Sequence, residues 1–131
     1  YDIKYKVDGK EYSGNYSFIF ITNATRIAGM DDIYYDIKLD DNMFEIAFAS
    51  PKNKAELLKL AAQVLNRDIK NIPGITYYQT DNLEIEFLKK PKTSWCVDGE
   101  EYTMRGNKFK FTVDKSMQML MPKENVKKLF K

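Results

Sequence analysis

The sequence has no histidine among its 131 residues and only one cysteine, Cys96. The lack of histidine excludes a Ser-His or Cys-His nucleophile pair and any histidine-ligated metal within this chain. A general base must therefore be a carboxylate, and a metal ion would need oxygen ligands. A single cysteine excludes an internal disulfide, so we expect a reducing, cytosolic setting.

Long apolar runs and a strong excess of one charge are also missing. No run approaches the roughly 20 apolar residues of a membrane-spanning helix. The start, YDIKYKV, alternates apolar and polar residues, unlike the apolar block of a signal peptide. The 21 basic and 19 acidic residues leave a net charge of +2, which gives no case for a nucleic-acid partner. Tyr1 begins inside a strand-like pattern, so we expect a piece of a longer protein.

The sequence is instead rich in short β-strand patterns. Residues 3–7 alternate in the manner of a half-buried strand. Tyr16–Thr22 is apolar on both faces, which predicts a central strand covered on both sides. Met43–Ala49 places its aromatic and aliphatic side chains on one face. Further strand patterns follow at short intervals: ITYYQT, LEIEFLK, SWCVD, EEYTM, KFKFTVD and MQMLMP.

One middle segment, about residues 53–66, has the spacing of a helix. Asn53 and Glu56 form a capping-box-like start just after Pro51. Its predicted apolar face consists of Leu57, Leu58, Leu60, Ala61, Val64 and Leu65. KENVKKLFK at the end of the chain is compatible with a short C-terminal helix. The whole pattern predicts a mainly β domain, a β-sandwich or barrel of short antiparallel strands with one inserted helix.

Two nearly identical hexapeptides, VDGKEY and VDGEEY, raise the question of a catalytic carboxylate. An Asp-Gly pair is most simply a hairpin turn, which is how we interpret Asp8-Gly9-Lys10. Asp98-Gly99-Glu100 follows an apolar approach that contains Trp95, the single tryptophan. We expect Glu100 to lie at a strand end beside this bulky side chain. Partial burial would raise the pKa of Glu100 and suit it to act as a general base.

Adjacent carboxylates at Asp40-Asp41 are the candidate metal ligands. Such pairs are usually solvated turn residues. They are also hard oxygen ligands, and a turn exposes carbonyls that can complete a Mg²⁺ or Ca²⁺ shell. A separate basic cluster, Lys89, Lys90 and Lys92, is most simply a solvated surface; the sharper hypothesis is weak attraction to anionic lipid.

An ordered set of motifs carries a family resemblance: FIFITNATRIAGM, IKLDDNMFEIAF, a helix, SWCVDGE and FTVDKSMQMLMP. In this order and spacing the chain resembles the C-terminal half of the bacterial diacylglycerol kinase family, soluble lipid kinases that include sphingosine kinase-like proteins. The resemblance covers essentially the whole chain. It implies that residues 1–131 form a single β-sandwich domain of a two-domain kinase. The N-terminal domain of such kinases holds ATP with a Gly-Gly-Asp-Gly-type loop, which this sequence lacks.

The resemblance also implies roles for individual residues. It makes Glu100 the proton acceptor and Asp41 the side-chain ligand of a structural Mg²⁺, with the backbone carbonyls of Lys38 and Met43 as further ligands. Asn42 stands where the family often has glycine, and asparagine is the next-best residue for a left-handed turn. EYTMRG after the Asp-Gly motif departs from the family's common Tyr-Gly-Gly, which leaves the loop shape and the lipid preference open.

The expected activity is transfer of the γ-phosphate of ATP to the hydroxyl of diacylglycerol or a related lipid at the membrane surface. The enzyme would be cytoplasmic and peripheral to the membrane, and related proteins often form homodimers. The isolated chain would be inactive without the nucleotide-binding domain. Two alternatives stay open: a non-catalytic β-sandwich module that binds lipid or protein, and a related kinase acting on a sphingoid base or a polyprenol.

Overall fold

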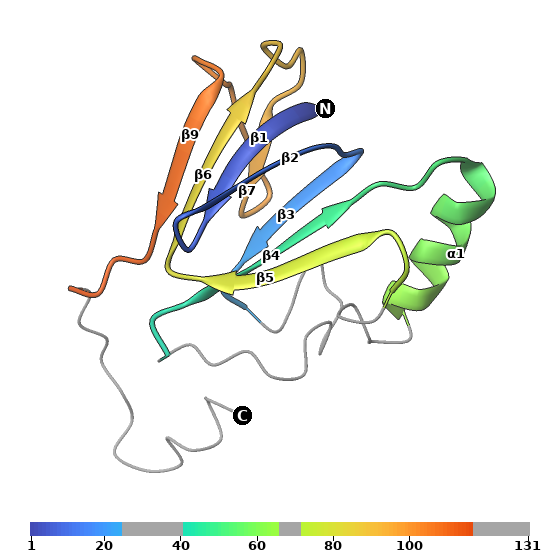
Figure 1. The fold of residues 1–131 in the computed structure, drawn as a ribbon, viewed down its shortest axis with the longest axis horizontal. Helices are drawn as coiled ribbons and strands as arrows, with labels where there is room; N and C mark the ends of the chain where they lie inside the picture. The colour runs from blue at the N-terminus through green and yellow to red at the C-terminus, as the bar shows by residue number, and fades with distance from the viewer. Residues whose placement is uncertain (25–40, 66–71, 117–131) are drawn as a thin grey trace.

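The computed structural model describes residues 1–24, 41–65 and 72–116 (Figure 1). Four sequence predictions lie outside these residues: the carbonyl ligand Lys38, Asp40 of the Asp40-Asp41 pair, the strand MQMLMP and the C-terminal helix at 123–131. Within the described residues the chain is mainly β, with antiparallel strand pairs throughout and one helix. The predicted fold class is therefore confirmed.

The first layer is a four-stranded sheet in the order β2-β1-β6-β9. Its strands are β1 (Asp2–Val7), β2 (Lys10–Asn15), β6 (Asn82–Phe87) and β9 (Lys108–Thr112). Side chains alternate between its two faces as the sequence predicts, because successive residues of a strand point to opposite sides. The inward residues of β1 and β6 are buried, and the outward face carries charged side chains in complementary cross-strand pairs.

The second layer is a three-stranded sheet in the order β3-β4-β5, made of β3 (Phe18–Thr22), β4 (Phe44–Ala49) and β5 (Ile75–Thr80). The prediction that Tyr16–Thr22 is a strand covered on both sides is wrong. It is an edge strand of the described sheet, with Phe18 39% and Phe20 45% exposed, whereas all six residues of β4 are buried. Phe18 and Phe20 lie opposite Ala49 and Ala47, whose small side chains cannot cover the rings. An apolar pattern on both faces therefore did not distinguish an edge strand from a central one.

The core lies between the two sheets, as expected of a sandwich. The rings of Tyr5 and Phe48 are 4.4 Å apart and those of Tyr12 and Tyr78 are 5.6 Å apart, so β1 and β2 pack on β4 and β5. Burial raises the pKa values of Tyr5 and Tyr78 above the ordinary tyrosine range, and the hydroxyls of these two residues are hydrogen-bonded at 3.2 Å. The buried cluster contains Ile3, Tyr5, Val7, Phe44, Ile46, Phe48, Leu83, Ile85, Phe87 and Met104.

A small hairpin, β7 (Trp95–Val97) and β8 (Glu100–Tyr102), forms a separate two-stranded sheet that packs against β6 and β9. It is attached through Trp95, whose ring makes edge contacts with Phe87 at 6.1 Å and with Phe109 and Phe111 at 5.7 Å. These aromatic contacts fix the base of the hairpin, while its turn extends from the opposite end of the two strands.

Helix α1 (Lys54–Leu65) begins where the capping box predicts. The Glu56 backbone N–H donates to Asn53 Oδ1 at 2.9 Å, and the Lys52 N–H donates to Glu56 Oε2 at 2.8 Å. The predicted apolar face is not packed as a whole: among the described helix side chains Leu60 alone is buried, and Leu58 is 72% exposed. Figure 1 shows why, since α1 stands beside the sheets instead of lying across them. The helix formed by the described residues lacks the length and apolar character that crossing a bilayer would require.

Candidate functional site

The two Asp-Gly turns have the same backbone conformation. Asp8 and Gly9 have φ values of 49° and 77°, and Asp98 and Gly99 have 51° and 92°. Positive φ at both central residues is the mark of a type I′ turn, whose twist suits a two-residue hairpin. Each turn joins strands paired directly across it, so the sequence prediction of two hairpins is confirmed.

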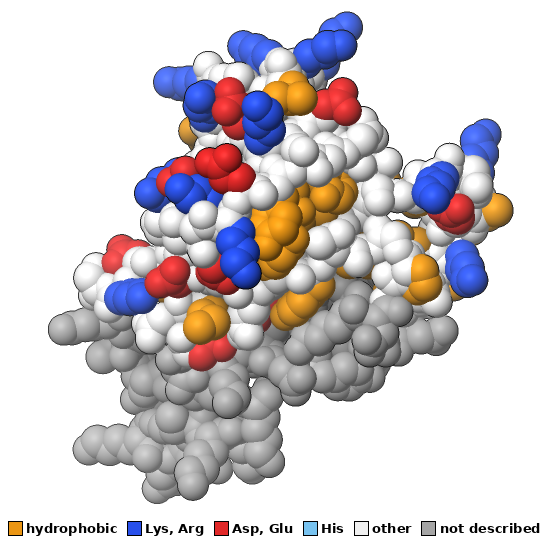
Figure 2. Space-filling model, in the orientation of Figure 1, with side chains coloured by type: hydrophobic (Ala, Val, Ile, Leu, Met, Phe, Trp, Pro, Cys, Tyr) orange, Lys and Arg blue, Asp and Glu red, His pale blue; other side chains and the backbone are white. Residues whose placement is uncertain are grey.

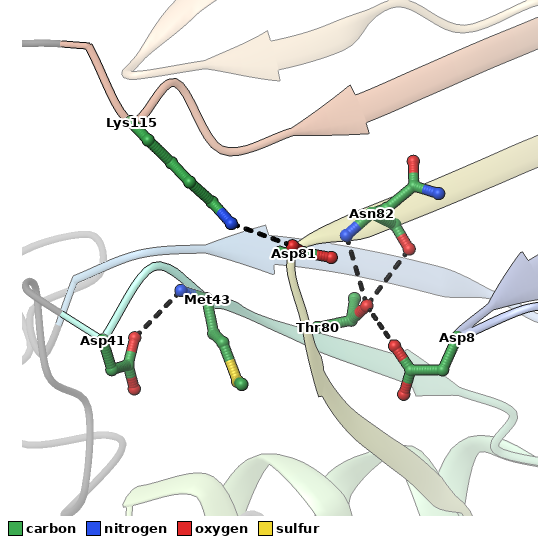
Figure 3. Close-up of polar contacts among 7 residues, drawn as sticks. All are labelled: Asp8, Asp41, Met43, Thr80, Asp81, Asn82 and Lys115. Atoms are coloured by element: carbon green, nitrogen blue, oxygen red, sulfur yellow. Dashed lines mark hydrogen bonds and ion pairs between the residues drawn. The ribbon is translucent and has the colours of Figure 1, made fainter.

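The surroundings of the two turns differ. Asp8 Oδ1 accepts a 2.7 Å hydrogen bond from the hydroxyl of Thr80, a residue that is 98% buried, so the first turn is tied to the β5–β6 connection (Figure 3). Asp98 is exposed and makes no hydrogen bond or ion pair with another described residue. The first turn therefore has a structural role, whereas the second presents its side chains to the outside.

Glu100 is the first residue of β8, pairs with Val97 and is exposed. The expectation that Trp95 would partly bury this carboxylate is wrong. Trp95 lies at the base of the hairpin and points into the Phe87, Phe109 and Phe111 cluster, away from the turn. In this structure Glu100 is an accessible carboxylate on a well-anchored hairpin. The next residue, Glu101, is held differently, since Ser94 donates to its Oε1 at 2.7 Å.

Asp41 and Met43 share a tight turn that leads into β4. Asn42 between them has a φ of 60°, the left-handed conformation expected for the residue that replaces glycine here. The Met43 backbone N–H donates to Asp41 Oδ1 at 2.9 Å, which closes the turn around the aspartate (Figure 3). The structure thus brings together two of the three predicted ligand residues, while Lys38 is outside the described residues.

Two residues near Asp41 were not identified from the sequence. Gln79 Nε2 on β5 donates both to Asp41 Oδ2 at 3.0 Å and to Glu45 Oε1 at 3.2 Å. Glu45 is 1% exposed and pairs with Gln79 across β4 and β5. The sequence feature that could have revealed this pair is the single carboxylate inside FEIAFA, a strand that is otherwise apolar on both faces. A buried carboxylate needs hydrogen-bond donors, so a polar residue on a neighbouring strand was to be expected.

The chemistry of this turn fits a magnesium ion to the extent that it offers oxygen donors. Carboxylate and backbone carbonyl oxygens are the ligands that Mg²⁺ and Ca²⁺ take in proteins. Within residues 1–24, 41–65 and 72–116, however, no group of three or more Asp, Glu, His or Cys side chains is placed to hold a metal. A cation at Asp41 would therefore depend on backbone carbonyls for much of its shell.

Glu100 and Asp41 belong to separate parts of the domain. Asp41 precedes β4 of the three-stranded sheet, and Glu100 stands on the β7–β8 hairpin. The hollow on the outer face of the four-stranded sheet, with a volume of about 640 Å³, contains neither residue. That hollow is lined by cross-strand ion pairs, including Lys108–Glu86 at 3.3 Å and Lys110–Glu84 at 3.2 Å. Exposed pairs of this kind are typical of a solvated sheet face.

No family model matches the chain, but it is similar to known proteins that are all described as diacylglycerol kinases. It is 23% identical over 128 residues to the diacylglycerol kinase of Bacillus subtilis (strain 168), a match that covers 98% of this chain and 41% of that protein, in its C-terminal part. Two solved structures of putative diacylglycerol kinases from Bacillus anthracis str. Sterne superpose with TM-scores of 0.61 and 0.63, at 15% and 14% identity. They cover 88% and 86% of this chain and 42% and 39% of theirs.

The resemblance recognised in the sequence is therefore confirmed: the relatives in sequence and in fold are diacylglycerol kinases. The chain spans about two fifths of the length of the curated relative that it matches.

Proposed function

We propose that this chain is the C-terminal domain of an ATP-dependent lipid kinase, which transfers the γ-phosphate of ATP to the hydroxyl of diacylglycerol or a related lipid. The observation that carries the proposal is the match of 98% of the chain to the C-terminal part of a diacylglycerol kinase. The β-sandwich and its two Asp-Gly hairpins are consistent with the motif order from which the resemblance was recognised.

Glu100 is the proposed general base. As the lipid hydroxyl oxygen attacks the γ-phosphorus of ATP, the bond from phosphorus to the β-phosphate oxygen breaks and ADP leaves. The proton of the attacking hydroxyl passes to the Glu100 carboxylate, the kind of group left for this role in a chain without histidine. The exposure of Glu100 supports this role, because an accessible carboxylate can meet a substrate held against another domain. Closure against that domain would remove water from around the carboxylate.

The nucleotide would be held outside this chain. A Walker motif and a Gly-Gly-Asp-Gly loop are both absent from the sequence. We therefore infer that ATP and its accompanying Mg²⁺ bind to an N-terminal domain, and that residues 1–131 alone are catalytically inactive. Positioning two reactants contributes much of the rate in phosphoryl transfer, so a domain that holds only one of them cannot perform the reaction.

A second, structural Mg²⁺ is proposed at the turn that contains Asp41. The Asp41 carboxylate and the backbone carbonyls of Lys38 and Met43 would hold it. The ion would neutralise the carboxylate and brace the entry to β4. Gln79 orients the Asp41 side chain by donating a hydrogen bond to its Oδ2. The left-handed conformation of Asn42 determines the path of the backbone through the turn.

The enzyme would act at the cytoplasmic surface of the membrane, because its acceptor is a membrane lipid. We propose that it attaches there peripherally. Diacylglycerol, a sphingoid base and a polyprenol all offer a hydroxyl, and the EYTMRG sequence after Glu100 is where we expect the preference among them to be encoded. A homodimer is compatible with this arrangement.

One observation favours the alternative of a non-catalytic binding module. The Glu100 side chain has no hydrogen bond or ion pair with another described residue, as expected of a plain turn. The complete protein in which the chain occurs distinguishes the two functions. Transfer of labelled phosphate from ATP to diacylglycerol in mixed micelles supports the kinase, and no transfer to any lipid hydroxyl favours the binding module.

A further inference from the structure

Two connections meet at one end of the four-stranded sheet, where β6 ends and β9 begins. The Phe87 backbone N–H donates to the Asn107 carbonyl at 2.7 Å, and Asn107 Nδ2 donates to the Phe87 carbonyl at 3.1 Å. The β6–β7 and β8–β9 connections therefore lie side by side. They carry Leu88, Lys89, Lys90, Lys92 and Arg105, which we call the basic end.

The four cations of the basic end are exposed, and none forms an ion pair with another described residue. Lysines elsewhere on the same sheet are paired, as Lys108 is with Glu86. Figure 2 shows several Lys and Arg side chains at the top of the molecule, with some acidic side chains among them, where β6 ends and β9 begins. Unpaired cations at one place leave a local positive field that the net charge of +2 does not reveal.

An apolar side chain stands among these cations. Leu88 is 54% exposed although its backbone is fixed, since its N–H donates to the Asp2 carbonyl at 2.9 Å. The same connection is held at its far side by a 2.6 Å hydrogen bond between the hydroxyls of Thr93 and Tyr1. The connection is thus an anchored platform that directs Leu88 and the lysines outward. Cations beside an exposed apolar side chain are the combination that binds an anionic lipid surface.

The described turns at the opposite end of the sandwich carry charges of both signs, with Lys10 and Lys115 among the aspartates. The turns there carry Asp8, Asp41 and Asp81, which Figure 3 shows near the β5–β6 connection. Lys115 Nζ forms an ion pair with Asp81 Oδ2 at 3.1 Å. The side chains of Asp8 and Asp41 accept their hydrogen bonds from uncharged groups.

We propose that the basic end docks on an anionic phospholipid surface. Its use in catalysis rests on the proposed function. Strand β7 begins three residues after Lys92, and Arg105 follows the end of β8 by three residues, so the basic end is the base of the hairpin that carries Glu100. Docking through this end places the base of that hairpin at the surface, whereas Glu100 lies at the turn, at the opposite end of the two short strands.

The test uses the complete protein and vesicles without ATP, so that binding is measured apart from catalysis. Cosedimentation compares phosphatidylcholine vesicles with vesicles of equimolar phosphatidylcholine and phosphatidylglycerol. The triple variant Lys89→Gln, Lys90→Gln, Lys92→Gln is expected to lose about a hundredfold in affinity for the anionic vesicles, on the order of fivefold per charge. Leu88→Ser is expected to weaken binding severalfold also at high salt, where charge attraction is screened.

The matched control is Lys52→Gln, Lys54→Gln, Lys59→Gln, which removes the same charge from exposed positions on and before α1. It is expected to bind within about twofold of the native protein. The proposal is overturned if the native protein and the Lys89, Lys90, Lys92 variant bind the anionic vesicles with equal affinity. Equal losses of affinity in the two triple variants would also overturn it, and so would tighter binding to duplex DNA than to the anionic vesicles. Melting temperatures confirm that each variant folds. Phosphate transfer in neutral micelles is assayed separately, so its failure would contradict the kinase and leave the docking result intact.

Discussion

The side-chain amide of Gln79 donates a 3.0 Å hydrogen bond to Asp41 Oδ2 and a 3.2 Å bond to the buried Glu45 from the same nitrogen. It joins the turn before β4 to the middle of the three-stranded sheet. The proposed metal-binding turn is thus coupled to the core. The stability of the domain should therefore depend both on Mg²⁺ and on the hydrogen bonds that Gln79 donates.

Asp41→Ala is expected to lower thermal stability far more in Mg²⁺ than in chelator. A ligand at 100 times its Kd stabilises the state that binds it by about 2.7 kcal/mol, and the variant should lose that share. Differential scanning calorimetry of the complete protein in both buffers measures it. Asp81→Ala is the control, because its exposed ion pair with Lys115 should cost the same small amount in both. Equal losses for Asp41→Ala in Mg²⁺ and in chelator would refute the metal assignment.

Gln79→Met is expected to destabilise the domain by roughly 2–4 kcal/mol, since hydrogen bonds to charged groups are worth about 1.5–3 kcal/mol each and Glu45 has little access to water. Urea unfolding measures this loss. A double-mutant cycle with Asp41→Asn isolates the Gln79–Asp41 contact, and the two changes should be non-additive by at least ~0.5 kcal/mol. Additive effects would show that the contact does not couple the turn to the sheet.

Alkaline pH should destabilise the fold through Tyr5 and Tyr78. Burial raises their pKa values in the folded state, so they stay protonated while the same residues ionise in the unfolded chain near pH 10, about the ordinary value. The stability is therefore present below about pH 10 and is lost as the pH rises above it. Tyr5→Phe should lose less stability than the native protein between about pH 9 and pH 11. Parallel pH profiles in urea unfolding would contradict the assignment.

Trp95 is expected to act as a positioning residue for the Glu100 hairpin. Trp95→Ala removes the aromatic contacts with Phe87, Phe109 and Phe111 and should cost about 3 kcal/mol of stability. Trp95→Phe keeps part of these contacts and should recover most of the loss. In the folded Trp95→Phe protein, kcat should fall several-fold while KM for ATP stays the same. A change in KM for ATP without a change in kcat would argue against this role.

Local rules predicted the hairpins and the helix start well. Asp-Gly pairs require the positive φ values found at Asp8 and Asp98, and Asn53 caps α1 as its spacing with Glu56 indicates. What failed depends on distant neighbours. Phe18 and Phe20 are exposed because Ala47 and Ala49 lie opposite them, and Leu58 is exposed because α1 stands beside the sheets. Glu100 is exposed for the same kind of reason, since Trp95 packs toward β6 and β9. The pairing of Glu45 with Gln79 depends on strand register, which a single sequence does not specify.

The most direct test of the central claim is the activity of Glu100→Gln in the complete protein. Phosphate transfer from ATP to diacylglycerol in mixed micelles is compared for the native protein, for Glu100→Gln and for the control Glu101→Gln, which changes the neighbouring carboxylate that Ser94 holds. We predict a loss of about a hundredfold or more in kcat for Glu100→Gln, the lower end of a general base's contribution, and a small effect for Glu101→Gln. Native activity in Glu100→Gln, or equal losses in both variants, would contradict the account and leave Asp98-Gly99-Glu100 as a hairpin turn alone.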